Sequence, residues 1–211
     1  MNRRHVVFTS DWHIGHKNIL SFCPRPYKDL DEMHRMFVKN YNNNVHDSTV
    51  GYFLGDMGIS SHQILKDVVS QLRGTKVLIL GNHDNKTNSM YNAGFDVVMY
   101  GCRLVIQGEL VTLTHCPLRG VLREDCSNMK NHQPGDKWYG ESRETNQPFQ
   151  IDNYGQFHLH GHIHSPNGGK SKKICGRQFD VGVDANNYKP VQQSEIERFI
   201  AKIKKEALNG K

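Results

Sequence analysis

Short apolar segments alternate along the chain with stretches in which apolar residues recur every three or four positions. Short apolar runs predict strands, and the three-to-four spacing predicts amphipathic helices. Predicted strands occupy residues 5–10, 49–55, 76–80, 95–100, 103–107, 110–115, 157–161 and 177–184. Predicted helices occupy residues 30–45, 61–72 and 194–208. This order predicts an α/β protein with mixed sheets and helices outside, in which the closely spaced strands between 95 and 115 pair antiparallel.

One long segment does not fit this pattern. Residues 119–156 are polar and rich in turn-forming residues, with no clear period. So long a stretch without regular structure in a compact domain is usually a functional lid or disordered. Since 211 residues suit one core, we expect a single domain over residues 1–211 with an insert or lid at about 119–156.

Composition narrows the class of protein. No apolar run approaches the length that spans a membrane, and the N-terminus lacks the apolar core of a signal peptide. The five cysteines are scattered and never form a CxxC pair, which argues against a disulfide framework and indicates a reducing, cytoplasmic setting. The net charge of +6 suits a phosphate-bearing partner. Because the lysines fall in separate clusters, we do not expect polymeric nucleic acid as a partner. Nor do we expect a membrane, and the oligomeric state stays open.

Groups that bind metals or carry protons follow five of the predicted strands. In HLHGHIH, histidines occupy every second position, which fits either one edge of a strand or a metal site. The strand-end residues are Asp11, His13, Asp56, Asn82, His83, Asp84, His115, His162 and His164. Ligand sites of sheet proteins gather at strand ends, so this set predicts a metal site. We expect His158 and His160 to be ordinary strand residues.

The order D-x-H, G-D, G-N-H-D, a strand-end histidine and G-H-x-H resembles the calcineurin-like metallophosphoesterases, and in detail the small bacterial and phage-borne predicted phosphoesterases. The resemblance spans residues 6 to about 189, without 119–156. It implies a four-layer α/β/β/α sandwich of two mixed sheets with two metal ions at its edge. One ion would be held by Asp11, His13, Asp56 and His164, and the other by Asp56, Asn82, His115 and His162. Oxygen and nitrogen donors without thiolate suit Mn²⁺, the expected ion, and also permit Fe²⁺, Ni²⁺, Co²⁺ or Zn²⁺.

The resemblance also implies an activity. Two ions would activate a bridging water to attack the phosphorus of a small phosphodiester, nucleotide-like or a cyclic nucleotide. His83 would protonate the leaving oxygen, and Asp84 would orient its ring. Candidate substrate contacts are His16, Arg25, Arg119 and Arg143, each with an alternative as a surface or loop-bracing residue. The alternative functions are a phosphomonoesterase or protein phosphatase, a nuclease, and a non-catalytic scaffold.

Overall fold

The protein is described by a computed structural model over residues 5–58, 62–84, 87–118, 151–164 and 174–209. The helices are α1 (Ile19–Phe22), α2 (Leu30–Asn42), α3 (His62–Val69), α4 (Thr87–Ala93) and α5 (Gln193–Asn209), with a short 3-10 helix, η1 (Val183–Ala185). The strands are β1 (Val6–Thr9), β2 (Val50–Phe53), β3 (Thr75–Ile79), β4 (Val97–Met99), β5 (Cys102–Ile106), β6 (Glu109–Leu113), β7 (Phe157–His160), β8 (Ile174–Cys175), β9 (Gln178–Asp180) and β10 (Val191–Gln192). The α/β class predicted from the sequence is therefore confirmed.

The described strands form two mixed sheets. In the first sheet the order is β10-β1-β2-β3-β4; β1 to β4 run parallel, and β10 pairs antiparallel with β1. In the second the order is β5-β6-β7-β9-β8, with β6, β7 and β9 parallel and the two edge strands antiparallel. Parallel neighbours end at the same edge of a sheet, so the carboxyl ends of four strands meet in the first sheet and those of three strands in the second.

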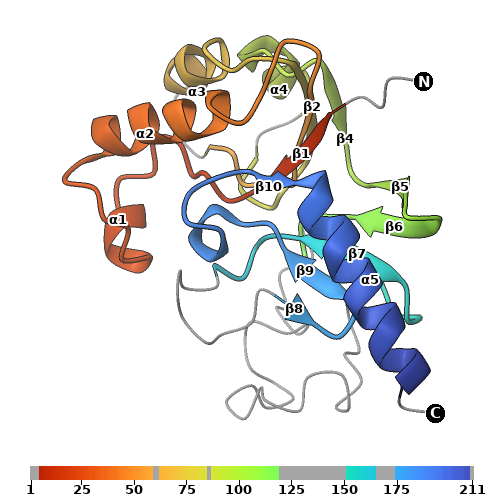
Figure 1. Cartoon of the computed structure of the whole chain (residues 1–211). Helices are drawn as coiled ribbons and strands as arrows, with labels where there is room; N and C mark the ends of the chain where they lie inside the picture. The colour runs from red at the N-terminus through yellow and green to blue at the C-terminus, as the bar shows by residue number, and fades with distance from the viewer. Residues whose placement is uncertain (1–4, 59–61, 85–86, 119–150, 165–173, 210–211) are drawn as a thin grey trace.

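The first sheet separates two apolar cores. Along each strand alternate side chains point to opposite faces, as strand geometry requires. Val7, Phe53 and Leu78 pack with residues of α2, α3 and α4. Phe8 and Leu54 pack against the second sheet, together with apolar residues of α5. Figure 1 shows α2, α3 and α4 grouped on one side and α5 crossing the opposite side of the molecule.

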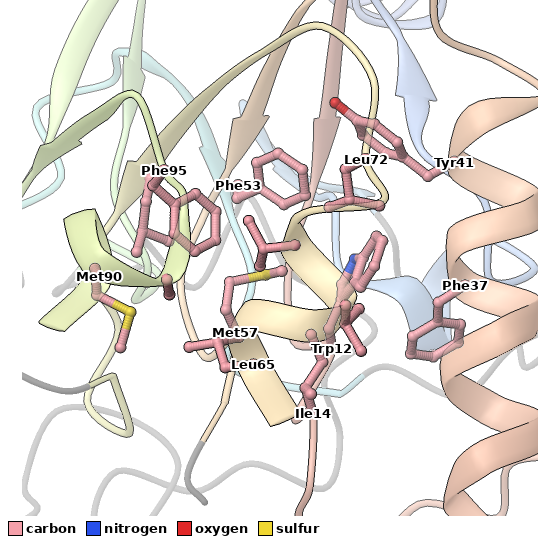
Figure 2. Close-up of a cluster of buried hydrophobic side chains, with 14 of the residues drawn as sticks. Trp12, Ile14, Phe37, Tyr41, Phe53, Met57, Leu65, Leu72, Met90 and Phe95 are labelled. Carbon is pink, nitrogen blue, oxygen red and sulfur yellow. The ribbon is translucent and has the colours of Figure 1, made fainter. Parts of the chain in front are cut away.

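Trp12 anchors the helix-side core. Its indole is 2% exposed and makes edge contacts with Phe37, Tyr41 and Phe53, at centroid distances of 5.3, 6.0 and 5.8 Å. Its Nε1 donates to Thr9 Oγ1 at 2.8 Å. Figure 2 shows the ring within this cluster. The indole therefore fixes the segment just beyond β1 to the core.

Several features of the fold differ from the sequence-based prediction. The last predicted strand, 177–184, is shorter, with β9 followed by the 3-10 helix η1, and α1 and β10 were not predicted. Residues 97–99 (β4) pair parallel with β3 in the first sheet, whereas only β5 and β6 of the predicted antiparallel group form a hairpin. The reason is α4, a crossover helix that the apolar pattern did not reveal and that returns the chain to the same edge. The predicted helix at 30–45 ends earlier, at Asn42, although it begins at Leu30 as expected. Asp29 caps this start and accepts a hydrogen bond from the Glu32 amide at 2.8 Å.

Most of the predicted insert, residues 119–150, lies outside the described residues. The prediction of a lid therefore stays a prediction. In the described ranges, no helix is long and apolar enough to cross a membrane.

Phe37→Ala should lower the free energy of unfolding by about 3–5 kcal/mol, because Phe37 is 1% exposed and its loss leaves a cavity in the core. Urea denaturation followed by circular dichroism measures the change. The matched control is Phe22→Ala, at a ring that is 71% exposed, where the change should stay below about 0.5 kcal/mol. Equal losses at the two positions would contradict this assignment of the core.

Candidate metal centre

The candidate residues gather where strand ends of the two sheets meet. Asp11 and His13 follow β1, Asp56 follows β2, and Asn82 follows β3, three neighbouring parallel strands of the first sheet. The others belong to the second sheet, where His115 follows β6, and His162 and His164 follow β7. The two sets are joined by a β-bridge between Ser10 and Gly182 and by the His162 amide, which donates to the Asp11 carboxylate at 3.0 Å. Residues far apart in the sequence thus share one site.

Strained backbone is concentrated at these positions. Five of the seven predicted ligands have left-handed φ angles, namely Asp11 (63°), His13 (52°), Asp56 (53°), His162 (72°) and His164 (46°). Such angles cost about 1–3 kcal/mol for a residue other than glycine and are found preferentially at functional sites. The close packing also requires Gly161, because a Cβ there would lie 2.5 Å from Asp11 Oδ2. The backbone is therefore bent to bring these side chains together.

One group of donor atoms forms a small triangle. His115 Nε2 lies 2.9 Å from Asn82 Oδ1 and 3.1 Å from His162 Nδ1, and the last two atoms are 3.0 Å apart. Two ligands at right angles about an ion, each about 2.1 Å from it, lie about 3.0 Å apart. The triangle therefore has the dimensions of one face of an octahedral site.

A second group lies on the other side of Asp56. His13 Nε2 and His164 Nε2 are 3.0 Å apart, and donor atoms of Asp11 lie within 4.8 Å of both rings. Asp56 Oδ2 lies 3.6 Å from His13 Nε2 and 3.3 Å from His115 Nε2. Asp56 thus stands between the two groups, in the place of a bridging ligand.

Hydrogen bonds orient two of the histidines. His115 Nδ1 donates to the Leu54 carbonyl at 2.7 Å, which directs Nε2 toward Asp56. His164 Nδ1 donates to Asp184 Oδ2 at 2.7 Å, which directs Nε2 toward His13. Fixing one ring nitrogen so that the other is available is how proteins usually support histidine ligands.

The electrostatics of the site favour a cation. Asp11 and Asp56 are both buried, and among the described residues no lysine or arginine forms an ion pair with either carboxylate. Burial raises the pKa of Asp11 to about 7. The pKa of Asp56 is lowered, since the charge of His115 and its hydrogen bond outweigh burial. For His115, burial is in turn outweighed by Asp56, which raises the imidazole pKa to about 9. The proton that His115 carries toward Asp56 therefore lies where a cation would bind, and a bound cation would displace this proton.

Two of the rings are suited to bind a metal without losing a proton. Burial lowers the pKa of His13 to about 2 and the pKa of His162 to about 3, so both imidazoles are neutral at neutral pH. Neutral imidazole is the form that binds metals. Together with the carboxylates and Asn82, these donors fit hard or borderline divalent ions.

Two thiols lie at the margins of the site, which the sequence did not reveal. Cys116 Sγ lies within 4.8 Å of ring nitrogens of His115 and His162, and Cys23 Sγ lies equally close to donor atoms of His164 and Asp184. Burial raises the pKa of Cys116 to about 12, so without a cation beside it this thiol keeps its proton at neutral pH.

Asp84 supports the site in a way that differs from the prediction. Its two carboxylate oxygens accept hydrogen bonds from the amides of Gly81, Asp56 and Met57, at 2.8–2.9 Å. In the described ranges no bond joins them to the His83 ring. Asp84 thus fixes the turn that presents Asp56, rather than orienting His83. His83 itself is exposed beside the centre; its ring is 5.4 Å from that of His13, and its amide donates to Asp56 Oδ1 at 2.9 Å.

The prediction of Arg25 as a substrate contact is wrong. Its side chain is 0% exposed, and its Nε and Nη2 pair with both oxygens of Asp184 at 2.8 Å. The remaining N–H groups donate to the carbonyls of Asp11 and Trp12 and to Met33 Sδ. All five guanidinium hydrogens are therefore used inside the protein, and none is left for a phosphate. Arg25 instead braces the loop after β1, the alternative role open from the sequence.

The other predicted contacts have mixed outcomes. His16 lies in the wall of the pocket beside the centre, with its ring 5.6 Å from that of His13. Arg119 and Arg143 lie outside the described residues. His158 and His160 belong to β7, as expected, and their buried rings stack at 5.5 Å.

Asp184 is the supporting residue that sequence reasoning missed. It joins Arg25 to His164, although 159 residues separate it from Arg25 and 20 from His164. It stands in the segment VDANNYKP, and a single aspartate after a strand carries no sequence signal that would distinguish it from a turn residue.

Arg25→Met should lower the free energy of unfolding by about 3–5 kcal/mol, because it removes the guanidinium that pairs with the buried Asp184 carboxylate and, among the described residues, leaves that group with His164 alone. The matched control is Arg35→Met on the exposed side of α2, where the change should stay within about 0.5 kcal/mol. Urea denaturation measures both. An unchanged midpoint for Arg25→Met would contradict the bracing role assigned to this side chain.

Comparisons with known proteins add the following. No protein-family model matches the chain. Among solved structures, the Aquifex aeolicus protein AQ665, whose function is unknown, superimposes with a TM-score of 0.63 at 21% identity, over 93% of this chain and 100% of that one. This shows a shared fold. The phosphoesterase YfcE of E. coli gives a TM-score of 0.38 at 16% identity, over 85% of this chain and 79% of that one, which is too distant to carry an argument.

Two sequence relatives are closer. The chain is 30% identical over 206 residues to the uncharacterized protein MJ1445 of Methanocaldococcus jannaschii, covering 96% of this chain and 94% of that protein. It is 31% identical over 192 residues to the Gene 66 protein of Mycobacterium phage L5, covering 84% and 86%. At this identity and coverage, the chain belongs to the family that contains these archaeal and phage proteins.

Proposed function

We propose that the protein is a metal-dependent phosphoesterase with two divalent ions, which hydrolyses a small phosphodiester. The observation that carries this proposal is the pair of donor groups that share Asp56 at the carboxyl ends of parallel strands. The motif order that resembles the calcineurin-like metallophosphoesterases supports it independently. We extend the resemblance to the architecture as well, as one four-layer domain over residues 1–211.

The candidate ligands would form two sites, one for each ion. One would be formed by Asp11, His13, Asp56 and His164, and the other by Asp56, Asn82, His115 and His162. Ions held there would polarise a phosphate ester and lower the pKa of water toward neutrality. We expect Mn²⁺ in both sites.

Other residues would position the reaction and move protons. Asp56 is held by the turn that Asp84 fixes through three backbone amides. His83 projects beside the centre into the pocket, where its ring can donate a proton to the leaving oxygen. The pocket has a volume of about 1050 Å³, which suits a small molecule.

The first test is hydrolysis and metal binding by the purified protein. With Mn²⁺ added, we expect hydrolysis of bis-p-nitrophenyl phosphate above that of p-nitrophenyl phosphate. Asp56→Asn should abolish it and weaken Mn²⁺ binding by at least about 100-fold, since loss of a residue that merely supports a ligand already costs about 10–100-fold. Calorimetric titration of Mn²⁺ into metal-free protein gives the affinity and the number of ions.

Asp67→Asn serves as the matched control, because this carboxylate is exposed on α3. It should change neither quantity. Hydrolysis of the monoester alone would identify a phosphatase instead. Binding of Mn²⁺ without turnover of either ester would favour the alternative that the protein is a non-catalytic scaffold.

His83→Ala should lower kcat by about 10²- to 10⁴-fold while leaving Mn²⁺ affinity unchanged, since the ring serves the leaving group and is not among the proposed ligands. Initial rates and metal titration, measured on the same preparation, separate the two effects. His46→Ala, at another exposed histidine, is the control and should behave like the unaltered protein. A parallel fall in kcat and metal affinity would refute the assigned role.

A further inference from the structure

The pocket beside the candidate metal centre has two ends of different chemistry. The metal-binding end is formed by the histidines and Asp56. The apolar end is formed mainly by the segment after β1, and it is lined by Ile19, Phe22, Pro24 and Pro26, together with Tyr188. A phosphate held at the first end would place the organic part of the ester against the second.

Phe22 is the unusual residue of this end. It closes α1 with its ring 71% exposed, and exposing so large an apolar side chain forgoes the free energy of burying it. The ring lies 5.8 Å from that of His16, which lies 5.6 Å from that of His13, and the His13 ring is 5.4 Å from that of His83. A row of flat rings therefore leads from the metal centre to Phe22.

The segment that carries Phe22 is held firmly on both sides. Ile19 is 3% exposed in the helix-side core, and the Cys23 amide donates to its carbonyl at 2.9 Å. Three residues beyond Phe22, Arg25 is fixed by its five hydrogen bonds. In Figure 1, α1 lies within the segment that connects β1 to α2. Phe22 is thus exposed on a pre-positioned support, which reduces the entropy lost on binding.

Charge limits what this end can bind. Among the described residues that line the pocket there is no lysine or arginine, and the histidines near the centre are the only groups able to carry positive charge. Arg25, in the same segment, is fully used by Asp184 and backbone carbonyls. Among these described residues, a second phosphate or another anionic group would have no cationic partner at the apolar end.

From these observations we propose that Phe22 and the apolar residues around it form a subsite for a flat, uncharged organic group attached to the single phosphate of the substrate, such as an aryl group or a nucleobase. Stacking on Phe22 would select esters with such a group over small alkyl esters. The proposal rests on the proposed function, because the metal centre must hold the phosphate.

Inert analogues test this subsite without turnover. Isothermal titration calorimetry would compare phenylphosphonate with methylphosphonate on the Mn²⁺-loaded protein. We expect phenylphosphonate to bind tighter, and Phe22→Ala to weaken its binding on the order of 10-fold while leaving methylphosphonate unaffected. Phe22→Leu should also lose part of the preference, because leucine is apolar but not flat. Tyr154→Ala, at a ring that is 84% exposed and does not line the pocket, is the matched control and should keep the full preference.

The outcomes separate the two proposals. If both analogues bind in a Mn²⁺-dependent manner and Phe22→Ala leaves their ratio unchanged, the subsite is refuted and the phosphoesterase proposal stands. If neither analogue binds with Mn²⁺ present, the metal-held phosphate is refuted and the subsite with it. A preference for the phenyl compound that is lost only in the Phe22 variants supports both.

Discussion

The centre of this molecule depends on holding two carboxylates out of water at the ends of adjacent strands. Asp11 and Asp56 are almost fully buried, and in the described part of the chain their charges are met by imidazoles and backbone amides rather than by lysine or arginine. Burying a charge is costly unless it is paired. The surrounding histidines, the left-handed turns and the raised pKa values of Asp11 and His115 all follow from this arrangement, and a divalent cation would satisfy it.

Two clamps maintain the strained turns. On one side, the Asp84 carboxylate accepts hydrogen bonds from three backbone amides and so fixes the loop that carries Asp56. On the other, Arg25 binds the Asp11 and Trp12 carbonyls and pairs with Asp184, which in turn holds His164. Each clamp connects the centre to a separate stretch of chain, so the donor atoms are positioned before any ligand arrives. This organisation is what a site needs if it must hold two ions at a defined separation.

The pocket beside the candidate metal centre combines two kinds of surface. Most of its charged and polar groups come from the strand ends, whereas the loop after β1 contributes mainly apolar and aromatic surface, together with His16 and Cys23. The Arg25 side chain faces inward to stabilise that loop, and Phe22 faces outward from it. The same short segment therefore stabilises the metal-binding end and shapes the end that would recognise the organic group.

Local patterns in the sequence determined the fold class, the main strands and helices, and the candidate ligands, because apolar periodicity and strand-end polar residues are short-range signals. Asp11, His13, Asp56, Asn82, His115, His162 and His164 were all found in this way, and the structure brings them together. Only the tertiary structure decided what Arg25, Asp84 and Trp12 do. Each has the same local sequence whether it faces a ligand or the interior, and its role is set by partners elsewhere in the chain, as far as 159 residues away for Arg25 and Asp184. The parallel pairing of β4 likewise depended on a crossover helix, α4, whose sequence carries no clear apolar period.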